Sequence, residues 1–443
     1  MKIWKRRLLL ILLGDKSVEI EKHAKMISEG LSVLPTLQYG LSLGLGDKRW
    51  TMELLLATYH QAMTGTPPDS GLEYKVGYSG GGFDRLEFKA LSQIKTSDLP
   101  ATQNIDLSIP LNLRNEGPSI RSLIPVYGGG MSLGSVSLNF MLARAIAAQR
   151  LGSFTSTGEG GYPPILVPFR DHVITQVATG LFGVREETVQ YARVVEFKYA
   201  QGAKPGLGGH LLADKVTSMV AKMRESIPFT TLYSPFPFHS VYSVEDHKKH
   251  VDWIRTINPA ALVSVKVSTP GDIDMVAIGS YYAGANIFHI DGAYGGTGAA
   301  PEIAKKNIAM PIEYAIPIVH KYLKSEGVRD EIVLIASGGI RTAYDVAKAI
   351  ALGADGCVIG TAEAVAVGCT HCGNCERGRG CQIGITTTDP ELSLLIDPNW
   401  GAQRIVNLYN SWAIQWRRLL SFYDMKSIRE LRGRTDLLVY RGG

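Results

Sequence analysis

Cysteine is scarce in this chain and unevenly placed. The 443 residues contain only five cysteines, and Cys369, Cys372, Cys375 and Cys381 fall within thirteen residues. A content so low and so concentrated argues against a disulfide scaffold and indicates a reducing compartment, which we expect to be the cytoplasm. Cys357 stands apart in the apolar run GADGCVIGTA, where we expect a small buried hydrophobic side chain.

An excess of charge of one sign is also missing. Lys and Arg number 46 against 41 Asp and Glu, which gives a formal net charge of +5. Without a basic stripe interleaved with aromatic residues, the chain does not have the pattern of a nucleic-acid-binding protein. Its 45% hydrophobic and 20% charged residues instead suit a folded soluble protein with one large domain plus appendages.

Long hydrophobic runs are absent as well. No apolar stretch reaches the roughly 20 residues that a transmembrane helix needs, so we expect no membrane span. The N-terminus MKIWKRRLLLILLGDK has a basic start and the short apolar run LLLILL, without a small-residue cleavage site close behind it. We expect an amphipathic or docking helix there, and export or a membrane anchor is the alternative.

What the chain does have is a cysteine loop, GCTHCGNCERGRGCQIG. Its first three cysteines follow the spacing C-x2-C-x2-C, by which ferredoxin loops present sulfur ligands to an iron–sulfur cluster. A four-cysteine zinc site usually consists of two C-x2-C pairs well separated in sequence. The loop therefore predicts a metal centre, preferably iron–sulfur, with zinc or metal-free thiols as alternatives.

The beginning of the chain differs in pattern from the rest and predicts a helical extension. Ile20–Leu34 and Trp50–Met63 have helical patterns. The predicted division is an extension at residues 1–82, one domain at 83–425 with the cysteine loop at 369–381, and a tail at 426–443.

From residue 83 onwards, short β-branched or apolar runs alternate with helical patterns such as Ser243–Ile257, Pro311–Lys324 and Thr342–Leu352. Strands that alternate with helices indicate parallel βα units. Eight such units in this length predict an α/β fold, a (βα)8 TIM-type barrel, with a doubly wound sheet as the alternative. The predicted strands are Ser122–Val126, Ser153–Ser156, Val194–Tyr199, Thr230–Tyr233, Leu262–Val267, Asn286–Ile290, Ile332–Ala336 and Gly356–Ile359.

Glycines and polar residues cluster just after the predicted strands, and in a βα barrel these positions line the mouth that carries the active site. The segments are GGGMSLGS, STGEGG, QGAKPG, KVSTPG, DGAYGGTG, SGGIRT and GTAEA. The loops after the seventh and eighth strands, with Gly338, Gly339 and Gly360, suit a phosphate group. Lys266 ends the fifth strand, where it could stabilise a reduced flavin or, alternatively, form a surface salt bridge.

Taken together, these motifs resemble the FMN-binding synthase domain of glutamate synthases, from about Gly82 to about Leu420. The matching stretches are GMSLGSVS, STGEGGY, KYAQGAKPGLGG, LYSPFPFHSVYSVEDH, ALVSVKV, DGAYGGTGAAPEIA, IASGGIRTAYDVAKAIALGADG and the cysteine loop followed by GITTTDPEL.

The resemblance implies a barrel that carries FMN next to an iron–sulfur cluster. Such enzymes take electrons from NADPH or ferredoxin and reduce 2-iminoglutarate, formed from 2-oxoglutarate and ammonia, to L-glutamate. A glutaminase domain releases the ammonia. The FMN-binding positions implied by the resemblance are Ser132, Gly134, Thr157, Lys266, Gly296, Gly338, Gly339, Arg341, Gly360 and Thr361.

The resemblance also implies the substrate site. Lys198, Lys204 and Arg224 match basic positions that bind the dicarboxylate, and Arg suits a carboxylate because it donates two parallel hydrogen bonds. Glu159 matches a family carboxylate and, with Lys204, is expected to move protons during imine chemistry. For Arg224, a solvated helix residue is the alternative interpretation.

The chain departs from the family in two places. In the substrate loop a carboxylate has become Leu207 and an amide has become His210, which still donates a hydrogen bond to substrate. A related FMN-dependent synthase acting on another oxo acid or amine is therefore the alternative. Cys369, Cys375 and Cys381 match the three ligands of the family's three-iron cluster. Because Cys372 is additional, both 3Fe-4S and 4Fe-4S clusters stay open.

Two further family features are missing from this sequence. Position 2 is lysine rather than a catalytic N-terminal cysteine, and no strand-linked GxGxxG precedes an acidic residue. We therefore expect a stand-alone synthase subunit with separate glutaminase and electron-donor subunits, and no nucleic-acid or membrane partner. An electron-transfer subunit of a larger complex is the remaining alternative.

Overall fold

The computed structural model describes residues 49–68, 82–89, 100, 104–203, 209–295 and 298–441. The predicted helix Ile20–Leu34 lies outside the described residues, as do Lys204, Leu207 and Gly296. Trp50–Met63 is confirmed as a helix, α3, which spans Met52–Thr64.

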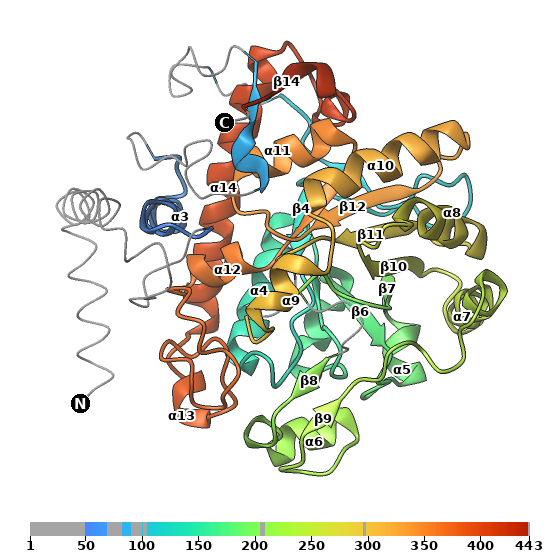
Figure 1. The fold of residues 1–443 in the computed structure, drawn as a ribbon. Helices are drawn as coiled ribbons and strands as arrows, with labels where there is room; N and C mark the ends of the chain where they lie inside the picture. The colour runs from blue at the N-terminus through green and yellow to red at the C-terminus, as the bar shows by residue number, and fades with distance from the viewer. Residues whose placement is uncertain are drawn as a thin grey trace.

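A parallel sheet of eight strands forms the centre of the molecule (Figure 1). Its edge strands β4 and β5 meet through a hydrogen bond from Gly128 N to Phe154 O at 2.8 Å and a parallel bridge between Gly130 and Ser156. The sheet thus closes on itself, and the predicted TIM-type barrel is confirmed. In barrel order the strands are β4 (Val126–Gly128), β13 (Gly356–Ile359), β12 (Val333–Ser337), β11 (Ile287–Asp291), β10 (Leu262–Ser268), β7 (Val194–Lys198), β6 (Val173–Ala178) and β5 (Thr155–Ser156).

Helices follow most of the strands and cover the outside of the barrel (Figure 1). Three begin where the sequence predicts, because Ser243 and Thr342 cap α7 (Val244–Ile257) and α11 (Ala343–Leu352), and Pro311 precedes α10. Of these three, α10 spans Ile312–Ser325. The remaining covering helices are α4 (Leu138–Leu151), α5 (Glu186–Gln190), α6 (Ser218–Arg224), α8 (Ile273–Ala283), α9 (Glu302–Asn307) and α12 (Thr361–Ala366).

One strand prediction was wrong, and one barrel strand was not predicted. Thr230–Tyr233 is not a barrel strand, since only β9 (Leu232–Tyr233) forms, paired antiparallel with β8 (His210–Leu211) outside the barrel. The third barrel strand is instead β6, which was not predicted. β-branched residues fit any pleated surface, so local propensity does not distinguish a barrel strand from a short hairpin.

The predicted first strand, Ser122–Val126, combines two elements. Ser122 belongs to β3 (Arg121–Ser122), which pairs antiparallel with β2 (Ile109–Pro110). Val126 is the first residue of β4. Only β4 is a strand of the barrel.

Segments far apart in sequence close the outside of the fold. The long helix α14 (Pro398–Phe422), which follows α13 (Pro390–Ser393), packs against α4 and α3 (Figure 1). Ser411 and Gln415 of α14 each donate a hydrogen bond to Gln61 of α3 at 2.9 Å. Strand β1 (Leu86–Phe88) pairs antiparallel with β14 (Leu438–Tyr440). The segment before the barrel is therefore tied to the C-terminal part of the chain.

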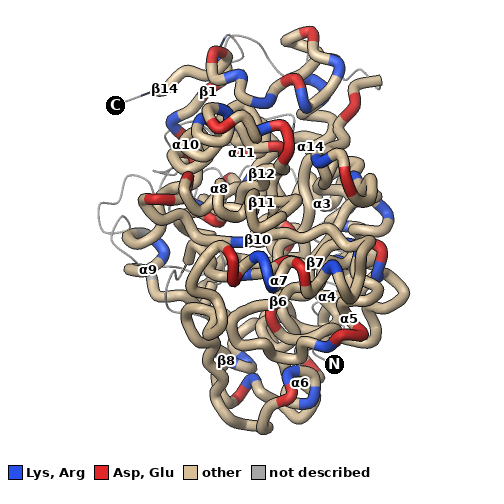
Figure 2. Tube along the Cα trace, turned by 90° about the vertical axis from the view of Figure 1, so that its right-hand side faces the viewer, with Lys and Arg blue, Asp and Glu red and all other residues tan. Residues whose placement is uncertain are grey.

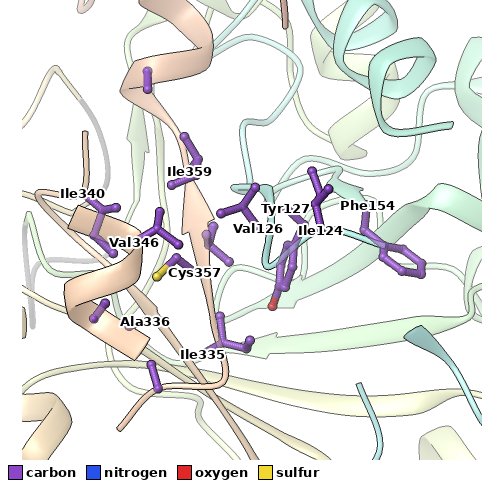
Figure 3. Close-up of a cluster of buried hydrophobic side chains, with 14 of the residues drawn as sticks. Ile124, Val126, Tyr127, Phe154, Ile335, Ala336, Ile340, Val346, Cys357 and Ile359 are labelled. Carbon is purple, nitrogen blue, oxygen red and sulfur yellow. The ribbon is translucent and has the colours of Figure 1, made fainter. Parts of the chain in front are cut away.

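The core between strands and helices is apolar. Cys357 lies in it, between Ile335, Ala336, Val346 and Ile359 (Figure 3), and it is fully buried. The expectation of a buried hydrophobic cysteine is confirmed, and burial raises the pKa of its thiol well above the usual range.

The described surface carries mixed charge. In the view of Figure 2, Lys and Arg are interspersed with Asp and Glu along the chain. Within the described residues, no helix has the length and apolar content needed to cross a membrane.

Candidate functional site

Two residues predicted for the substrate site meet at the barrel mouth. Glu159 lies in the turn after β5, and Lys198 is the last residue of β7. The Lys198 Nζ is 3.3 Å from Glu159 Oε2, and the two side chains are only 11% and 17% exposed. A Cβ added at Gly209 would lie 1.8 Å from Glu159 Oε1, so a larger residue there would displace this carboxylate. The mouth therefore holds a paired carboxylate and ammonium.

Arg224 lies close by at the end of α6. Its Nη2 donates to Ser132 Oγ at 2.8 Å and to the Leu133 carbonyl at 3.2 Å. Its guanidinium lies over the Phe182 ring, 5.6 Å from the ring centroid. Burial lowers the pKa of Arg224 to about 10, and the charge of Glu159 opposes that shift. With 5% of the residue exposed, Arg224 is not a solvated helix residue.

One donor of Arg224 is unsatisfied in the described part of the chain. Its Nε is buried and has no hydrogen-bond partner there. Buried polar groups are normally paired, and leaving one unpaired costs about 1–3 kcal/mol. A guanidinium with an unsatisfied donor beside a mouth is the arrangement that a substrate carboxylate would complete.

His210, predicted for the substrate site, lies in β8 and contacts the cysteine loop. Its Nε2 is 3.7 Å from Oε1 of Glu376, the residue directly after Cys375. This histidine therefore links β8 to the cysteine loop.

Lys266 lies beside Lys198, because the two residues are paired in the parallel register of β10 and β7. Its Nζ is 3.5 Å from Asp291 Oδ2 at the end of β11, and both side chains are buried. Burial raises the pKa of Asp291, but Lys266, His289 and hydrogen bonds from Ser337 and the Gly202 amide outweigh it, so this pKa lies below its usual range. The salt bridge foreseen for Lys266 thus exists, but it is buried inside the barrel rather than at the surface.

A second buried carboxylate, Glu196 of β7, continues this network. It accepts hydrogen bonds from Gln176 Nε2 at 2.7 Å and Ser264 Oγ at 3.2 Å, and it contacts His289 Nδ1 at 2.9 Å. Burial raises its pKa, but the charge and hydrogen bond of His289, with Lys266 and Gln176, lower it to about 2. His289 Nε2 in turn contacts Ser337 Oγ at 2.7 Å. A continuous polar chain therefore crosses the barrel interior.

Sequence reasoning missed Glu196, His289 and Asp291. The available signal was a charged residue inside an otherwise apolar strand, as in VVEFK and IFHID. Barrel interiors are normally filled by branched apolar side chains, so such a residue needs a function or a partner.

The loop after β12 contains Gly338 and Gly339, both with positive φ, of +100° and +73°. A Cβ at Gly338 would lie 2.6 Å from the Gly292 carbonyl oxygen, so the loop closes against the end of β11. Gly360 and Thr361 follow β13 at the start of α12, and a Cβ at Gly360 would meet only Met131 Cε at 3.4 Å. Space for a ligand to approach is therefore left at Gly360, whereas Gly338 packs closely on the end of β11.

Arg341 lies in the same loop but is engaged elsewhere. It is 1% exposed, with Nη2 2.7 Å from Asp84 Oδ1 and Nε 3.1 Å from Asp345 Oδ2. Burial lowers its pKa, but the two carboxylates more than reverse that effect and raise it. The phosphate contact predicted for Arg341 stays a prediction.

Three other positions predicted for FMN lie in the loops after β4 and β5. Ser132 accepts a hydrogen bond from Arg224, and Thr157 Oγ1 accepts one from the Gln176 backbone amide at 3.1 Å. Gly134 lies against Leu211 and Val220, because its Cβ would meet their side chains at 2.8 and 3.0 Å.

The cysteine loop follows α12. Burial raises the pKa of Cys369 to about 12; the His371 amide, which donates to its sulfur at 3.4 Å, lowers it, and the other three thiols raise it. Burial also raises the pKa of Cys375, and the nearby Thr386 side chain opposes that shift. The four thiols are thus close enough to influence one another.

Lys215, only 2% exposed, reinforces this loop. Its Nζ donates to the Cys375 carbonyl at 2.7 Å and lies among groups that favour its charge, including Cys375 and Cys381. The Tyr59 hydroxyl of α3 donates to the Cys369 carbonyl at 3.1 Å. Among the described residues, no three Cys, His, Asp or Glu side chains are grouped to hold one metal ion.

The closed barrel, with cations, carboxylates and glycine loops at its strand ends, defines a TIM-barrel protein with a candidate active site at its mouth. A family model described as the conserved region in glutamate synthase matches residues 87–425. The chain belongs to the glutamate synthase family, and the resemblance stated from the sequence is confirmed.

Three relatives illustrate this membership. The archaeal glutamate synthase [NADPH] of Methanocaldococcus jannaschii is 44% identical over 325 residues, 72% of this chain and 63% of that protein. The archaeal-type enzyme of a Thermotoga species is 36% identical over 408 residues, 88% of this chain and 80% of that protein. The glutamate synthase [NADPH] large chain of Azospirillum brasilense is 33% identical over 433 residues, 96% of this chain and 28% of that protein. This chain therefore spans only part of each relative.

Proposed function

We propose that this chain is an oxidoreductase that acts on the CH–NH2 group, a synthase subunit that reduces 2-iminoglutarate, formed from 2-oxoglutarate and ammonia, to L-glutamate. The observation that carries the proposal is the meeting of Glu159, Lys198 and Arg224 at the mouth, with a buried Arg224 donor left for a ligand. The alternative is a related FMN-dependent synthase acting on another oxo acid or amine, because Leu207 replaces a family carboxylate.

The two cations account for a dicarboxylate substrate. Arg224 binds one carboxylate with its planar fork, and its buried setting keeps water from competing for those hydrogen bonds. Lys198 binds the second charged or carbonyl group as a point charge. Lys204 and His210 add donors from the same loop in this proposal.

Glu159 manages the protons. Imine formation and reduction require a proton at the leaving oxygen and at the nitrogen, and a carboxylate within hydrogen-bonding reach serves both. Lys198 and Ser234, whose Oγ is 3.4 Å from Glu159 Oε2, hold its side chain in position. Lys204 is its proposed partner in this role.

The glycine loops fit FMN, since glycine lets backbone amides approach a phosphate closely and a Cβ at Gly360 would meet only Met131 Cε at 3.4 Å. When bound, FMN supplies the hydride that reduces the imine. Gly296, Gly338, Gly339, Gly360 and Thr361 would hold the phosphate and ribityl chain, and Ser132, Gly134 and Thr157 the other side of the cofactor. Lys266, paired with Asp291, would offset negative charge on the flavin ring.

The cysteine loop suits an iron–sulfur cluster better than zinc. Its first three cysteines follow the C-x2-C-x2-C spacing of ferredoxin loops, whereas a four-cysteine zinc site usually consists of two separated C-x2-C pairs. The His371 amide donates to the Cys369 sulfur, and the buried Lys215 Nζ donates to the Cys375 carbonyl, so both groups favour negative charge in the loop. Cys369, Cys375 and Cys381 are the proposed ligands, with Cys372 as a fourth if the cluster has four irons.

Partners complete the reaction. We propose a separate glutaminase subunit for ammonia and an electron-donor subunit linked to NADPH or ferredoxin, in the cytoplasm. The electron-transfer alternative is disfavoured because such a subunit has no use for the paired Glu159 and Lys198.

The test is a titration of the FMN-loaded chain with 2-oxoglutarate, followed through the flavin absorption spectrum, with succinate as a control that lacks the oxo group. A saturable change with 2-oxoglutarate at millimolar concentration or below is expected. No change with 2-oxoglutarate, together with a response to another oxo acid, would instead establish the related-synthase alternative.

A further inference from the structure

Lys215 is a buried cation between the cysteine loop and the loop after β4. It ends a short 3-10 helix, Ala213–Lys215, that follows β8, and only 2% of the residue is exposed. Its Nζ donates to the Cys375 carbonyl at 2.7 Å and to the Ser135 carbonyl at 3.4 Å. Ser135 belongs to the loop that also contains Ser132, one of the positions predicted for FMN. One ammonium therefore joins a loop of the proposed flavin site to the cysteine loop.

The same short helix holds the cysteine loop at a second point. Asp214 Oδ2 accepts a hydrogen bond from the Gly378 amide at 2.9 Å. A Cβ at Gly378 would lie 2.9 Å from the Asp214 carbonyl oxygen, so the two backbones are in close contact. Thr387 Oγ1 donates to the Gly378 carbonyl at 2.5 Å. Because these contacts do not involve Lys215, the loop keeps support when the charge of Lys215 is removed.

Cys375 also contacts the loop after β11. A Cβ at Gly298 of that loop would lie 2.8 Å from Cys375 Sγ. The backbone of Cys375 thus binds Lys215, while its sulfur lies against a second loop of the barrel mouth. Of the proposed cluster ligands, this cysteine has direct contacts towards the mouth on both sides.

The charges around Lys215 come first from the cysteines. Burial lowers the pKa of Lys215, whereas the charges of Cys375 and Cys381 raise it. Asp214 and Glu376 also raise it, to a smaller extent. A charge in a poorly solvated position acts more strongly on its neighbours than one in water. The reduction potential of an iron–sulfur cluster depends on the surrounding charge and on solvent exposure, so a cation held here would act on it.

We propose that Lys215 is a positioning residue that raises the reduction potential of the iron–sulfur cluster through its buried positive charge. This inference rests on the proposed function, because it assumes a cluster on the cysteine loop that receives electrons from the donor subunit and passes them to FMN. Each electron taken up adds one negative charge to the cluster. Lys215, fixed at the Cys375 carbonyl, therefore stabilises the reduced form more than the oxidised form.

The test is a redox titration of the cluster in full-length, cluster-loaded protein, followed by electron paramagnetic resonance. Lys215→Gln keeps a donor for the Cys375 carbonyl but removes the charge. Reduction should become roughly tenfold less favourable, which lowers the potential by about 59 mV for a one-electron couple. Lys215→Arg keeps the charge and should retain a potential close to that of the unaltered chain. Lys348→Gln is the matched control, because Lys348 of α11 is also buried and donates to a carbonyl, that of Phe83 at 2.9 Å.

Iron and acid-labile sulfide, measured on each variant, separate an effect on potential from an effect on folding. The inference predicts a lower potential in Lys215→Gln alone, with the cluster content unchanged. An unchanged potential in Lys215→Gln would overturn it, as would an equal fall in Lys215→Arg or in Lys348→Gln. Loss of the cluster from Lys215→Gln would make Lys215 a structural residue and would also overturn it. Absence of iron from the unaltered chain is a different result, because it would contradict the proposed electron route itself.

Discussion

The two sides of the barrel mouth differ in what they offer a ligand. On the side of β5 and β7, Glu159 and Lys198 form a partly exposed ion pair beside Arg224. On the side of β12, Arg341 is buried between two carboxylates, and the loop presents glycine backbone whose Gly339 carbonyl accepts a hydrogen bond from Arg49. On the side of β5 and β7, side chains form the site, so single substitutions can change its specificity. On the side of β12, the backbone forms the site, so few substitutions are tolerated. Substitutions should therefore act differently on the two sides.

The largest effect is expected from Gly339→Asp, on the backbone side. The new side chain would start 2.2 Å from Arg49 Nη2, at a φ of +73°, and would bring a negative charge to the phosphate site. We expect complete loss of FMN from the purified protein. Gly327→Asp is the control, because Gly327 has a φ of +76° and nothing within 4 Å of its Cβ. Full flavin occupancy in Gly339→Asp would show that the phosphate lies elsewhere.

On the side of β5 and β7, Glu159→Gln should lower the rate of the chemical step without changing cofactor binding. The amide retains the shape of the carboxylate but cannot accept a proton, so kcat should fall by about 10²- to 10⁴-fold. Flavin content, measured by absorption after denaturation, should not change. If kcat stayed within twofold of the unaltered chain, another group would have to move the protons.

A smaller effect is expected from Arg224→Lys, which keeps the charge but loses the fork. The KM for the oxo acid should rise roughly 10- to 100-fold while kcat changes little. Arg185→Lys, in an exposed pair with Glu225, should leave both constants unchanged. A fall in kcat with unchanged KM would contradict a substrate-binding role for Arg224.

The cysteine loop allows a comparison within one motif. Cys372→Ser should leave a three-iron cluster intact and disrupt a four-iron one, whereas Cys375→Ser should disrupt either. Iron and acid-labile sulfide, measured on protein purified anaerobically, distinguish these cases. Zinc in place of iron in the unaltered chain would remove the proposed electron route.

The smallest effect concerns stability and pH. Because the pKa of Glu196 is about 2 in the folded chain against 4.5 ordinarily, its stabilising contribution is fully present above pH 4.5 and is lost as the pH falls towards 2. Between pH 4.5 and 2, the free energy of unfolding should therefore fall less in Glu196→Gln than in the unaltered chain. We expect the two decreases to differ by on the order of 1–3 kcal/mol. Glu225→Gln, at an exposed ion pair, should follow the unaltered chain. Parallel curves for Glu196→Gln and the unaltered chain would contradict this.

Local patterns predicted the repeating part of this molecule well. Capping residues such as Ser243 and Thr342 mark helix starts within a residue, and glycine motifs mark the strand ends. The pairing of Glu159 with Lys198 follows once both are placed at the same end of the barrel. Strand β6 was not predicted because Gln176 interrupts its apolar run. In the structure this buried glutamine donates a hydrogen bond to Glu196, a partner that the local sequence does not reveal.

The contact between Arg49 and Gly339 could not be predicted either, because the two residues are 290 positions apart. The position of Arg49 over the Tyr294 ring is likewise encoded by no local pattern. The same holds for Arg341. In the sequence it is a cation in a loop, and only the structure shows its ion pair with Asp84 from a distant segment.

The most direct measurement follows reoxidation of the flavin in the chemically reduced, full-length protein under anaerobic conditions. Addition of 2-oxoglutarate together with ammonia should reoxidise the flavin and release L-glutamate in equal amount, while either compound alone should not. Flavin that stays reduced in the presence of both, in protein shown to be FMN-loaded, would contradict glutamate synthesis at this barrel mouth.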